Sequence, residues 1–223
     1  NGGCDPIQVI HVRHRTRATV HCRTLREART LPAPLMTLLA RTLTGLALVP
    51  ALLMALAAAL PLARASGAAA PWRAFHALAG LALLAALATL GLRSVAPDSA
   101  AAWQFAGLAG STPGAWMALL VQLLGTVIGV FSSRYLQGEA NQPRYLAAFA
   151  AVLAAVHMLL LAGHWLVLIA AWALVGTALQ RLLCFYPERA FALLAAHKKR
   201  LADRLADVLL LAAAACAWAE VGS

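Results

Sequence analysis

The sequence predicts an all-α integral membrane helix bundle with about six transmembrane helices. Hydrophobic residues make up 62% of the 223 residues and charged residues only 12%, whereas about a quarter of the residues in soluble domains are charged. Several apolar runs reach the roughly 20 residues that a helix needs to cross the hydrocarbon core of a bilayer. The net charge of +10 lies mainly at the ends of these runs and in residues 1–35. This distribution is typical of membrane topology signals and not of a nucleic-acid-binding face.

Residues 1–35 differ from the rest of the chain. They are rich in Arg and His, lack an apolar run and begin with Asn, whereas Met36 opens the first long apolar segment. We therefore expect residues 1–35 to be a basic leader that is non-native or disordered, and residues 36–223 to form the transmembrane helical domain. A tail that binds anionic lipid is the alternative. The Cys and His residues of this leader match no common zinc spacing.

Residues that begin or end helices separate the apolar segments. Pro71 opens the second segment, a polar loop over residues 94–112 leads to the third, and a turn over residues 137–143 precedes the fourth. Gly163 breaks the chain before the fifth, and residues 187–189 begin the sixth; Pro and Gly interrupt helical patterns most strongly. The expected helices cover about residues 37–63, 73–92, 113–136, 144–162, 164–186 and 190–218.

The basic residues near the ends of these segments predict the orientation, because cytoplasmic loops carry an excess of Lys and Arg. Arg41 and Arg93 lie on one side of the expected bundle. The loops on the other side, after the first, third and fifth helices, hold Arg64, Arg73, Arg134, Arg144 and Arg189. We therefore expect the domain from Met36 to start outside, with these odd-numbered loops in the cytoplasm.

The sixth expected helix carries charged residues inside an apolar span. Lys199 and Asp203 are four residues apart, and Arg204 and Asp207 are three apart, so both pairs can meet on one helix face. Charges within a bilayer are costly and mark ion pathways by default; a structural polar network and snorkelling to the interface are the alternatives. Arg181 either pairs with these aspartates or snorkels. The predicted ion pathway consists of Lys199, Asp203, Arg204, Asp207, Arg181 and His157.

His157 lies near the middle of the fourth expected helix. It is predicted as a relay residue, because imidazole changes protonation near neutral pH. A hydrogen bond to a neighbouring helix and haem ligation are the alternatives. The chain has no nucleotide-binding, hydrolase or metalloprotease motif. We expect a transporter subunit and not an enzyme, with no catalytic residue, cofactor or metal ligand in this chain; a purely structural membrane anchor is another possibility.

Several short motifs carry a family resemblance. Residues 131–136 (FSSRYL), followed by residues 144–145 (RY), resemble the junction of the third and fourth helices in antiporter-like membrane subunits. These include the chain-five subunit of NADH:quinone oxidoreductase and the large subunits of Mrp-type antiporters. Residues 181–183 (RLL), 185–189 (FYPER) and 195–199 (AAHKK) are most similar to one branch, the membrane subunit of the Dab-type inorganic-carbon pump (DabB).

The resemblance implies a function and a partner. It implies a subunit of an energy-coupled bicarbonate or CO2 uptake pump in the bacterial inner membrane, which conducts protons or another cation. The implied partner is a large peripheral carbonic-anhydrase-like subunit that binds zinc itself, and the chain would be the N-terminal part of a longer subunit. A respiratory or Mrp-type subunit is the alternative, but these carry Glu directly after the Trp that matches Trp172, where this chain has Ala173.

Overall fold

The computed structural model describes residues 33–63, 69–95, 104–105, 107–139, 141–185 and 190–221. The chain divides into two units, Asn1–Leu39 and Ala40–Ser223. In the first unit only the start of one helix is described, so the expected basic leader lies almost entirely outside the described residues.

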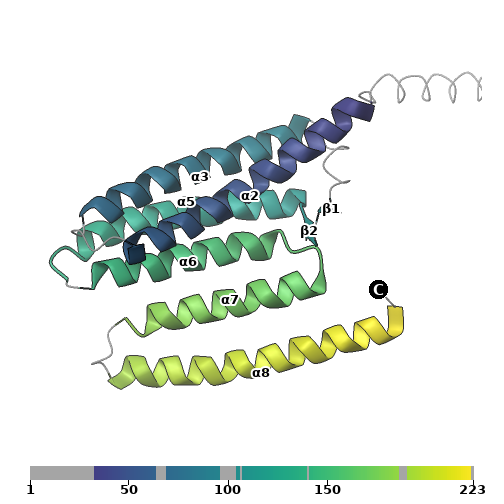
Figure 1. Ribbon diagram of the computed structural model, residues 1–223. Coiled ribbons are helices and arrows are strands. Elements are labelled where there is room, and N and C mark those ends of the chain that lie inside the picture. The colour runs from purple at the N-terminus through teal and green to yellow at the C-terminus, as the bar shows by residue number, and fades with distance from the viewer. Residues whose placement is uncertain are drawn as a thin grey trace, which may run out of the picture. The chain divides into compact units, whose positions relative to one another are not determined.

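The described residues form six helices, so the expected all-α class is confirmed (Figure 1). Each expected helix is present, with ends that differ by a few residues because capping and turn contacts decide where a helix stops. The helices are α2 (Ala33–Ala63), α3 (Ala69–Val95), α5 (Thr112–Tyr135), α6 (Gln142–Leu160), α7 (Trp165–Leu183) and α8 (Ala190–Val221).

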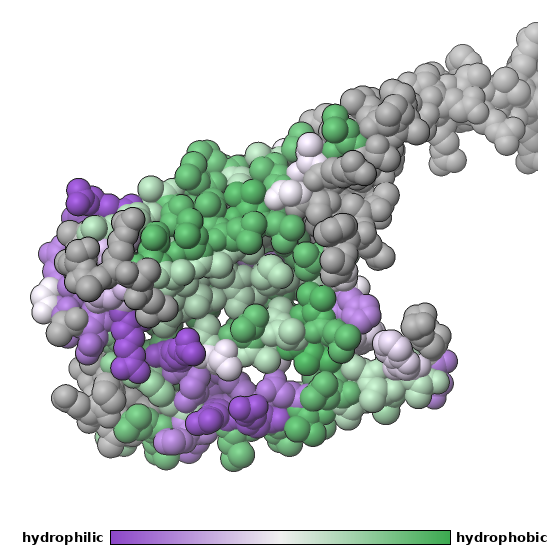
Figure 2. All heavy atoms as spheres, in the orientation of Figure 1, coloured by the Kyte–Doolittle hydropathy of each residue, from purple (hydrophilic) through white to green (hydrophobic). Residues whose placement is uncertain are grey.

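Four of these helices, α3, α5, α6 and α7, are long and apolar enough to cross a bilayer. α2 contains a shorter apolar stretch, Gly45–Pro61, and the apolar sequence of α8 is interrupted by six charged residues between positions 198 and 207. Large apolar side chains on the outer face of α5, among them Trp116 and Val127, are exposed. Figure 2 shows a broad hydrophobic surface over α2 and α3. Such a surface suits lipid as its surroundings.

The loop expected between the second and third helices contains a small hairpin. Strand β1 (Gln104–Phe105) pairs antiparallel with β2 (Leu108–Ala109) around Gly107, which has a φ of +76°. The hairpin also bonds the connection between α6 and α7: the Ala109 N–H donates to the Leu161 carbonyl at 2.8 Å, and the Gly163 N–H to the Gly107 carbonyl at 2.8 Å. The expected polar loop thus contains a hairpin that the sequence did not predict, in which backbone groups far apart in sequence satisfy each other.

Two helices at this end of the bundle begin with side-chain caps. The Ser111 Oγ accepts a hydrogen bond from the Gly114 N–H at 3.0 Å and starts α5. The His164 Nδ1 accepts from the Leu166 N–H at 3.1 Å and starts α7. Side-chain acceptors at this position satisfy N–H groups that the first helical turn leaves unpaired.

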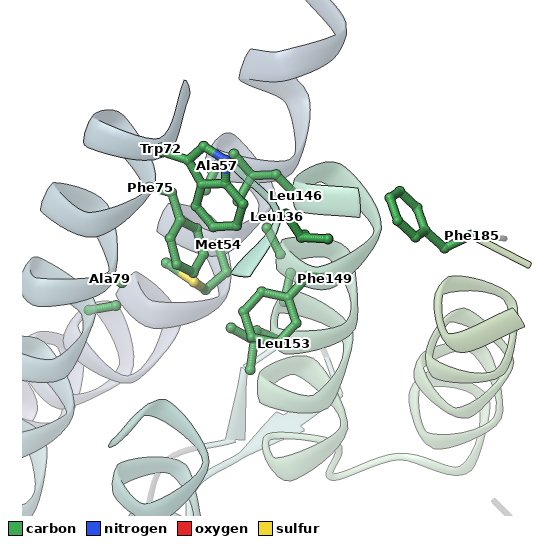
Figure 3. Close-up of a cluster of buried hydrophobic side chains, with 13 residues drawn as sticks. Met54, Ala57, Trp72, Phe75, Ala79, Leu136, Leu146, Phe149, Leu153 and Phe185 are labelled. Carbon is green, nitrogen blue, oxygen red and sulfur yellow. The ribbon is translucent and has the colours of Figure 1, made fainter. Parts of the chain in front are cut away.

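The core lies where α2, α3, α5 and α6 meet (Figure 3). Phe75 on α3 is fully buried, and its ring centroid lies 5.8 Å from that of Phe149 on α6. Trp72 packs edge-on against Phe75, and its indole N–H donates to the Gln142 Oε1 at 3.1 Å. Phe185, in the turn after α7, also belongs to this cluster. Its ring packs edge-on against that of Tyr145 on α6, with the centroids 5.4 Å apart.

Two glycines on α5 allow its neighbours to approach closely. A Cβ built on Gly129 would lie 2.3 Å from Phe75 on α3, and one built on Gly125 would lie 2.7 Å from Leu153 on α6. The two glycines are four residues apart, and small residues at this spacing let membrane helices pack backbone to backbone. α5 is thereby held between α3 and α6, while α7 and α8 follow in chain order beyond α6 (Figure 1).

Candidate functional site

The charged and the large apolar side chains of α8 lie largely on different sides of the helix. Five of the six charged residues between positions 198 and 207 line a cleft with α7, whereas Leu201, Leu205 and Val208 are 75%, 63% and 62% exposed. In water such a helix would bury its apolar face instead. In a membrane, this arrangement leaves the apolar face for lipid or another helix and places Lys199, Asp203 and Asp207 on the side of the cleft.

Lys199 connects the two helices of the site. Its ammonium pairs with the Asp203 carboxylate one turn further along α8 and lies 3.4 Å from the carbonyl oxygen of Gly176 on α7. A Cβ built on Gly176 would lie 3.3 Å from Asp203 Oδ2, so the missing side chain makes room for this pair. The predicted contact between Lys199 and Asp203 is therefore confirmed.

The pair lies in a cleft of about 450 Å³ between α7 and α8. Figure 2 shows hydrophilic residues gathered over the first half of α8. The cleft brings together five of the six residues predicted for the ion pathway, which are Arg181, Lys199, Asp203, Arg204 and Asp207. Arg200 also lines it, so its walls carry four basic and two acidic side chains.

Of the two alternatives for Arg181, pairing with an aspartate of α8 is not present among the described residues. Among the described residues, no ion pair joins Arg181 to Asp203 or Asp207, and its side chain is exposed. Arg204 is likewise exposed and makes no ion pair with Asp207 within the described part of the chain. The cleft therefore has one formed pair and further charges that remain accessible to a solute.

His157 does not lie in this cleft. It is in the last turn of α6, not near the middle of its helix as expected, because α6 ends at Leu160. Its side chain is 2% exposed, and its Nε2 lies 2.9 Å from the Gln122 Oε1 on α5. The Gln122 amide nitrogen in turn donates to the Ala79 carbonyl on α3 at 3.2 Å. His157 thus joins three helices, as the alternative of a bond to a neighbouring helix proposed.

The geometry around His157 does not fit a haem. Its Nε2 is occupied by Gln122, and the cavity that it lines measures about 20 Å³, which is far smaller than a porphyrin. His164, the other histidine of that region, caps α7. Within the described ranges, no group of three or more His, Cys, Asp or Glu side chains could hold a metal ion.

Two residues of these sites were missed by sequence reasoning. Gln122 is fully buried inside α5, and its position as an amide within an apolar helix was an available signal, because polar residues in membrane helices mark interhelical contacts. The second is Gly176 on α7. No local signal shows that an α8 side chain bonds to its carbonyl, because the two positions are 23 residues apart in sequence.

Comparison with known proteins adds one relative. The chain is 33% identical over 107 residues to a "probable inorganic carbon transporter subunit DabB2" from Halothiobacillus neapolitanus. The match covers 48% of this chain and 19% of that protein, so the similarity concerns a limited part of the relative. No family model matches the chain. Four apolar helices, together with similarity to a transporter subunit, indicate a DabB-like, multi-pass membrane protein.

Proposed function

We propose that this chain is part of the membrane subunit of an energy-coupled inorganic carbon (bicarbonate or CO2) uptake pump of a bacterial inner membrane. Its similarity to a probable inorganic carbon transporter subunit supports this proposal. In this role the chain is not an enzyme. It conducts protons or another cation and drives a large peripheral carbonic-anhydrase-like partner, which holds the zinc.

The cleft between α7 and α8 supports the part of the proposal that concerns cation conduction. A path for cations through a bilayer needs polar groups that are shielded from lipid. Lys199, Asp203 and Asp207 follow one another at intervals of four residues and line the cleft facing α7, while the opposite face of α8 is apolar. At this spacing the carboxylates of Asp203 and Asp207 lie about one helical turn apart, on the side of α8 that faces the cleft.

The Asp203 carboxylate, which pairs with Lys199, can bind a proton or cation that passes along such a path. A proton or cation that binds the Asp203 carboxylate competes with the Lys199 ammonium. The ammonium has a second acceptor at hand, because the Gly176 carbonyl oxygen lies 3.4 Å away. The ion pair can therefore open without leaving Lys199 unpartnered, which keeps the cost of a buried charge low.

The alternative is a proton-translocating subunit of NADH:quinone oxidoreductase or of an Mrp-type cation/proton antiporter. Those subunits carry Glu directly after the Trp that matches Trp172. In this chain Ala173 lines the cleft, and both carboxylates of the cleft come from α8. A path through this cleft would rely on Asp203 and Asp207, which favours the carbon-uptake reading over the respiratory one.

The test is uptake of radiolabelled inorganic carbon by a bacterial host without carbonic anhydrase. The host expresses the gene for this protein together with a gene for a candidate carbonic-anhydrase-like partner. We expect uptake above that of an empty vector, its loss with an uncoupler, and a strong reduction by Asp207→Asn. Glu139→Gln is the matched control, because it neutralises an exposed carboxylate in the turn after α5, outside the cleft.

The possible results distinguish cation conduction, the carbon substrate and the respiratory alternative from one another. Uptake that survives both the uncoupler and Asp207→Asn contradicts cation conduction through the cleft. A folded, membrane-inserted complex without any uptake contradicts the carbon substrate. Copurification with quinone-linked subunits instead of a zinc protein would select the respiratory alternative.

A further inference from the structure

A second polar site lies at the hairpin end of the bundle, away from the cleft between α7 and α8. Its centre is His157, which the proposed cleft path does not use. His157 belongs to the last turn of α6, next to the start of α7, whereas the cleft is lined by residues 172–181 of α7.

The hydrogen bonds around Gln122 determine which nitrogen of His157 carries a proton. The Gln122 amide nitrogen donates to the Ala79 carbonyl at 3.2 Å and lies 3.9 Å from the Met54 sulfur. The Gln122 Oε1 must therefore be the atom that faces His157, and a carbonyl oxygen can only accept. The His157 Nε2, 2.9 Å away, is then the donor. In the neutral ring, Nδ1 is left as an acceptor.

Among the described residues the ring makes one hydrogen bond, between Nε2 and Gln122, so Nδ1 is available to accept from a water. Buried polar atoms of this kind are commonly satisfied by an ordered water.

A cavity beside the ring has the size and the chemistry for such a water. It measures about 20 Å³ and is lined by His157 together with Thr89, Arg93 and Ser111. A water needs about 10–15 Å³ on this measure and about three polar partners. The Thr89 hydroxyl donates to the Ala85 carbonyl, which leaves its oxygen free to accept. The Ser111 oxygen accepts from the Gly114 N–H, which leaves its proton free to donate.

The cavity also connects the interior with an exposed position. His157 is 2% exposed, whereas Ser111, at the start of α5, is exposed beside the hairpin. Arg93, itself buried, is the other charged or titratable side chain among the described residues that line the cavity. A chain of polar groups thus leads from the end of the bundle to a fully buried imidazole.

We propose that this cavity is a water-binding site, in which a water bound to the His157 Nδ1 and to the hydroxyls of Thr89 and Ser111 gives solvent access to the bundle interior from the hairpin end. The site is separate from the cleft between α7 and α8. The proposal does not require that the protein transports inorganic carbon.

The experiment uses the complete protein in lipid nanodiscs with ¹⁵N-labelled histidine. The His157 signals are assigned by their loss in His157→Gln. We expect a neutral ring with the proton on Nε2, and magnetisation transfer from water to the ring. Ala118→Leu, which fills the cavity wall, should abolish the transfer. Ala88→Leu is the matched control, because Ala88 is exposed on α3 beside Thr89, and it should leave the transfer unchanged.

A second variant keeps the test decisive if Ala118→Leu does not fold. Thr89→Val removes one hydroxyl at nearly constant volume and should reduce the transfer while the protein stays folded. A proton on Nδ1 in the wild-type protein would overturn the proposal. So would a ring that receives no magnetisation from water, or a transfer that persists unchanged in folded Ala118→Leu and Thr89→Val proteins.

Discussion

The Nζ of Lys199 on α8 lies 3.4 Å from the carbonyl oxygen of Gly176 on α7, while the same ammonium pairs with Asp203. The contact is possible because position 176 has no side chain; a Cβ there would meet the Asp203 carboxylate at 3.3 Å. One glycine therefore determines how closely the charged face of α8 approaches α7.

Gly176→Leu should separate α7 from α8 and destabilise the protein by about 1–3 kcal/mol, because the larger side chain overfills a close contact. Chemical unfolding of the purified protein in detergent measures this change. Gly91→Leu is the matched control, because Gly91 lies on α3 with no atom within 4 Å of its Cβ position. Equal effects of the two substitutions would show that the contact at Gly176 does not hold the helices together.

The ion pair of Lys199 and Asp203 should contribute modestly. Its two side chains are 20% and 33% exposed, so solvent screens them in part. Lys199→Met, Asp203→Asn and the double variant form a cycle in which we expect a coupling energy of about 0.3–1 kcal/mol. Unfolding of the four proteins under identical conditions supplies the values. Additive effects of the two single substitutions would mean that the pair does not stabilise the fold.

Gln122→Leu should destabilise the protein by about 1–2 kcal/mol, because it leaves the His157 Nε2–H and the Ala79 carbonyl without their partner inside the bundle. Thermal unfolding in detergent is the measurement. Gln137→Leu makes the same chemical change at an exposed turn and should be nearly neutral. A Gln122→Leu protein as stable as the control would argue that these hydrogen bonds do not join the three helices.

Gly129→Ala should cost about 1–3 kcal/mol, because its Cβ would lie 2.3 Å from the Phe75 ring. Phe75→Leu in the same chain should recover part of this loss, since the smaller side chain makes room. Gly80→Ala, on α3 with open space around it, should be neutral or slightly stabilising. If the double variant shows no recovery, Phe75 is not the group that confines position 129.

The helices could be predicted because each depends on local properties. An apolar run of sufficient length forms a helix in a membrane whatever it packs against, since its backbone groups must bond to one another. For this reason α5 and α6 lie close to the expected residue ranges, and Lys199 and Asp203, four residues apart, meet as expected. The two-stranded hairpin at residues 104–109 was not predicted, because part of its bonding is to Leu161 and Gly163 in the connection after α6.

Which segments are helical, and that Lys199, Asp203 and Asp207 share one side of a helix, can be derived from the amino-acid sequence, because both follow from the length and the period of an α-helix. That this side faces Gly176, and that His157 lies with Gln122 on α5 instead of beside the charges of α8, depends on how the helices pack. Contacts between residues 23 and 35 positions apart depend on which helices are neighbours and how closely their backbones approach. No periodicity within one segment encodes that choice, since it arises from the packing of several helices together.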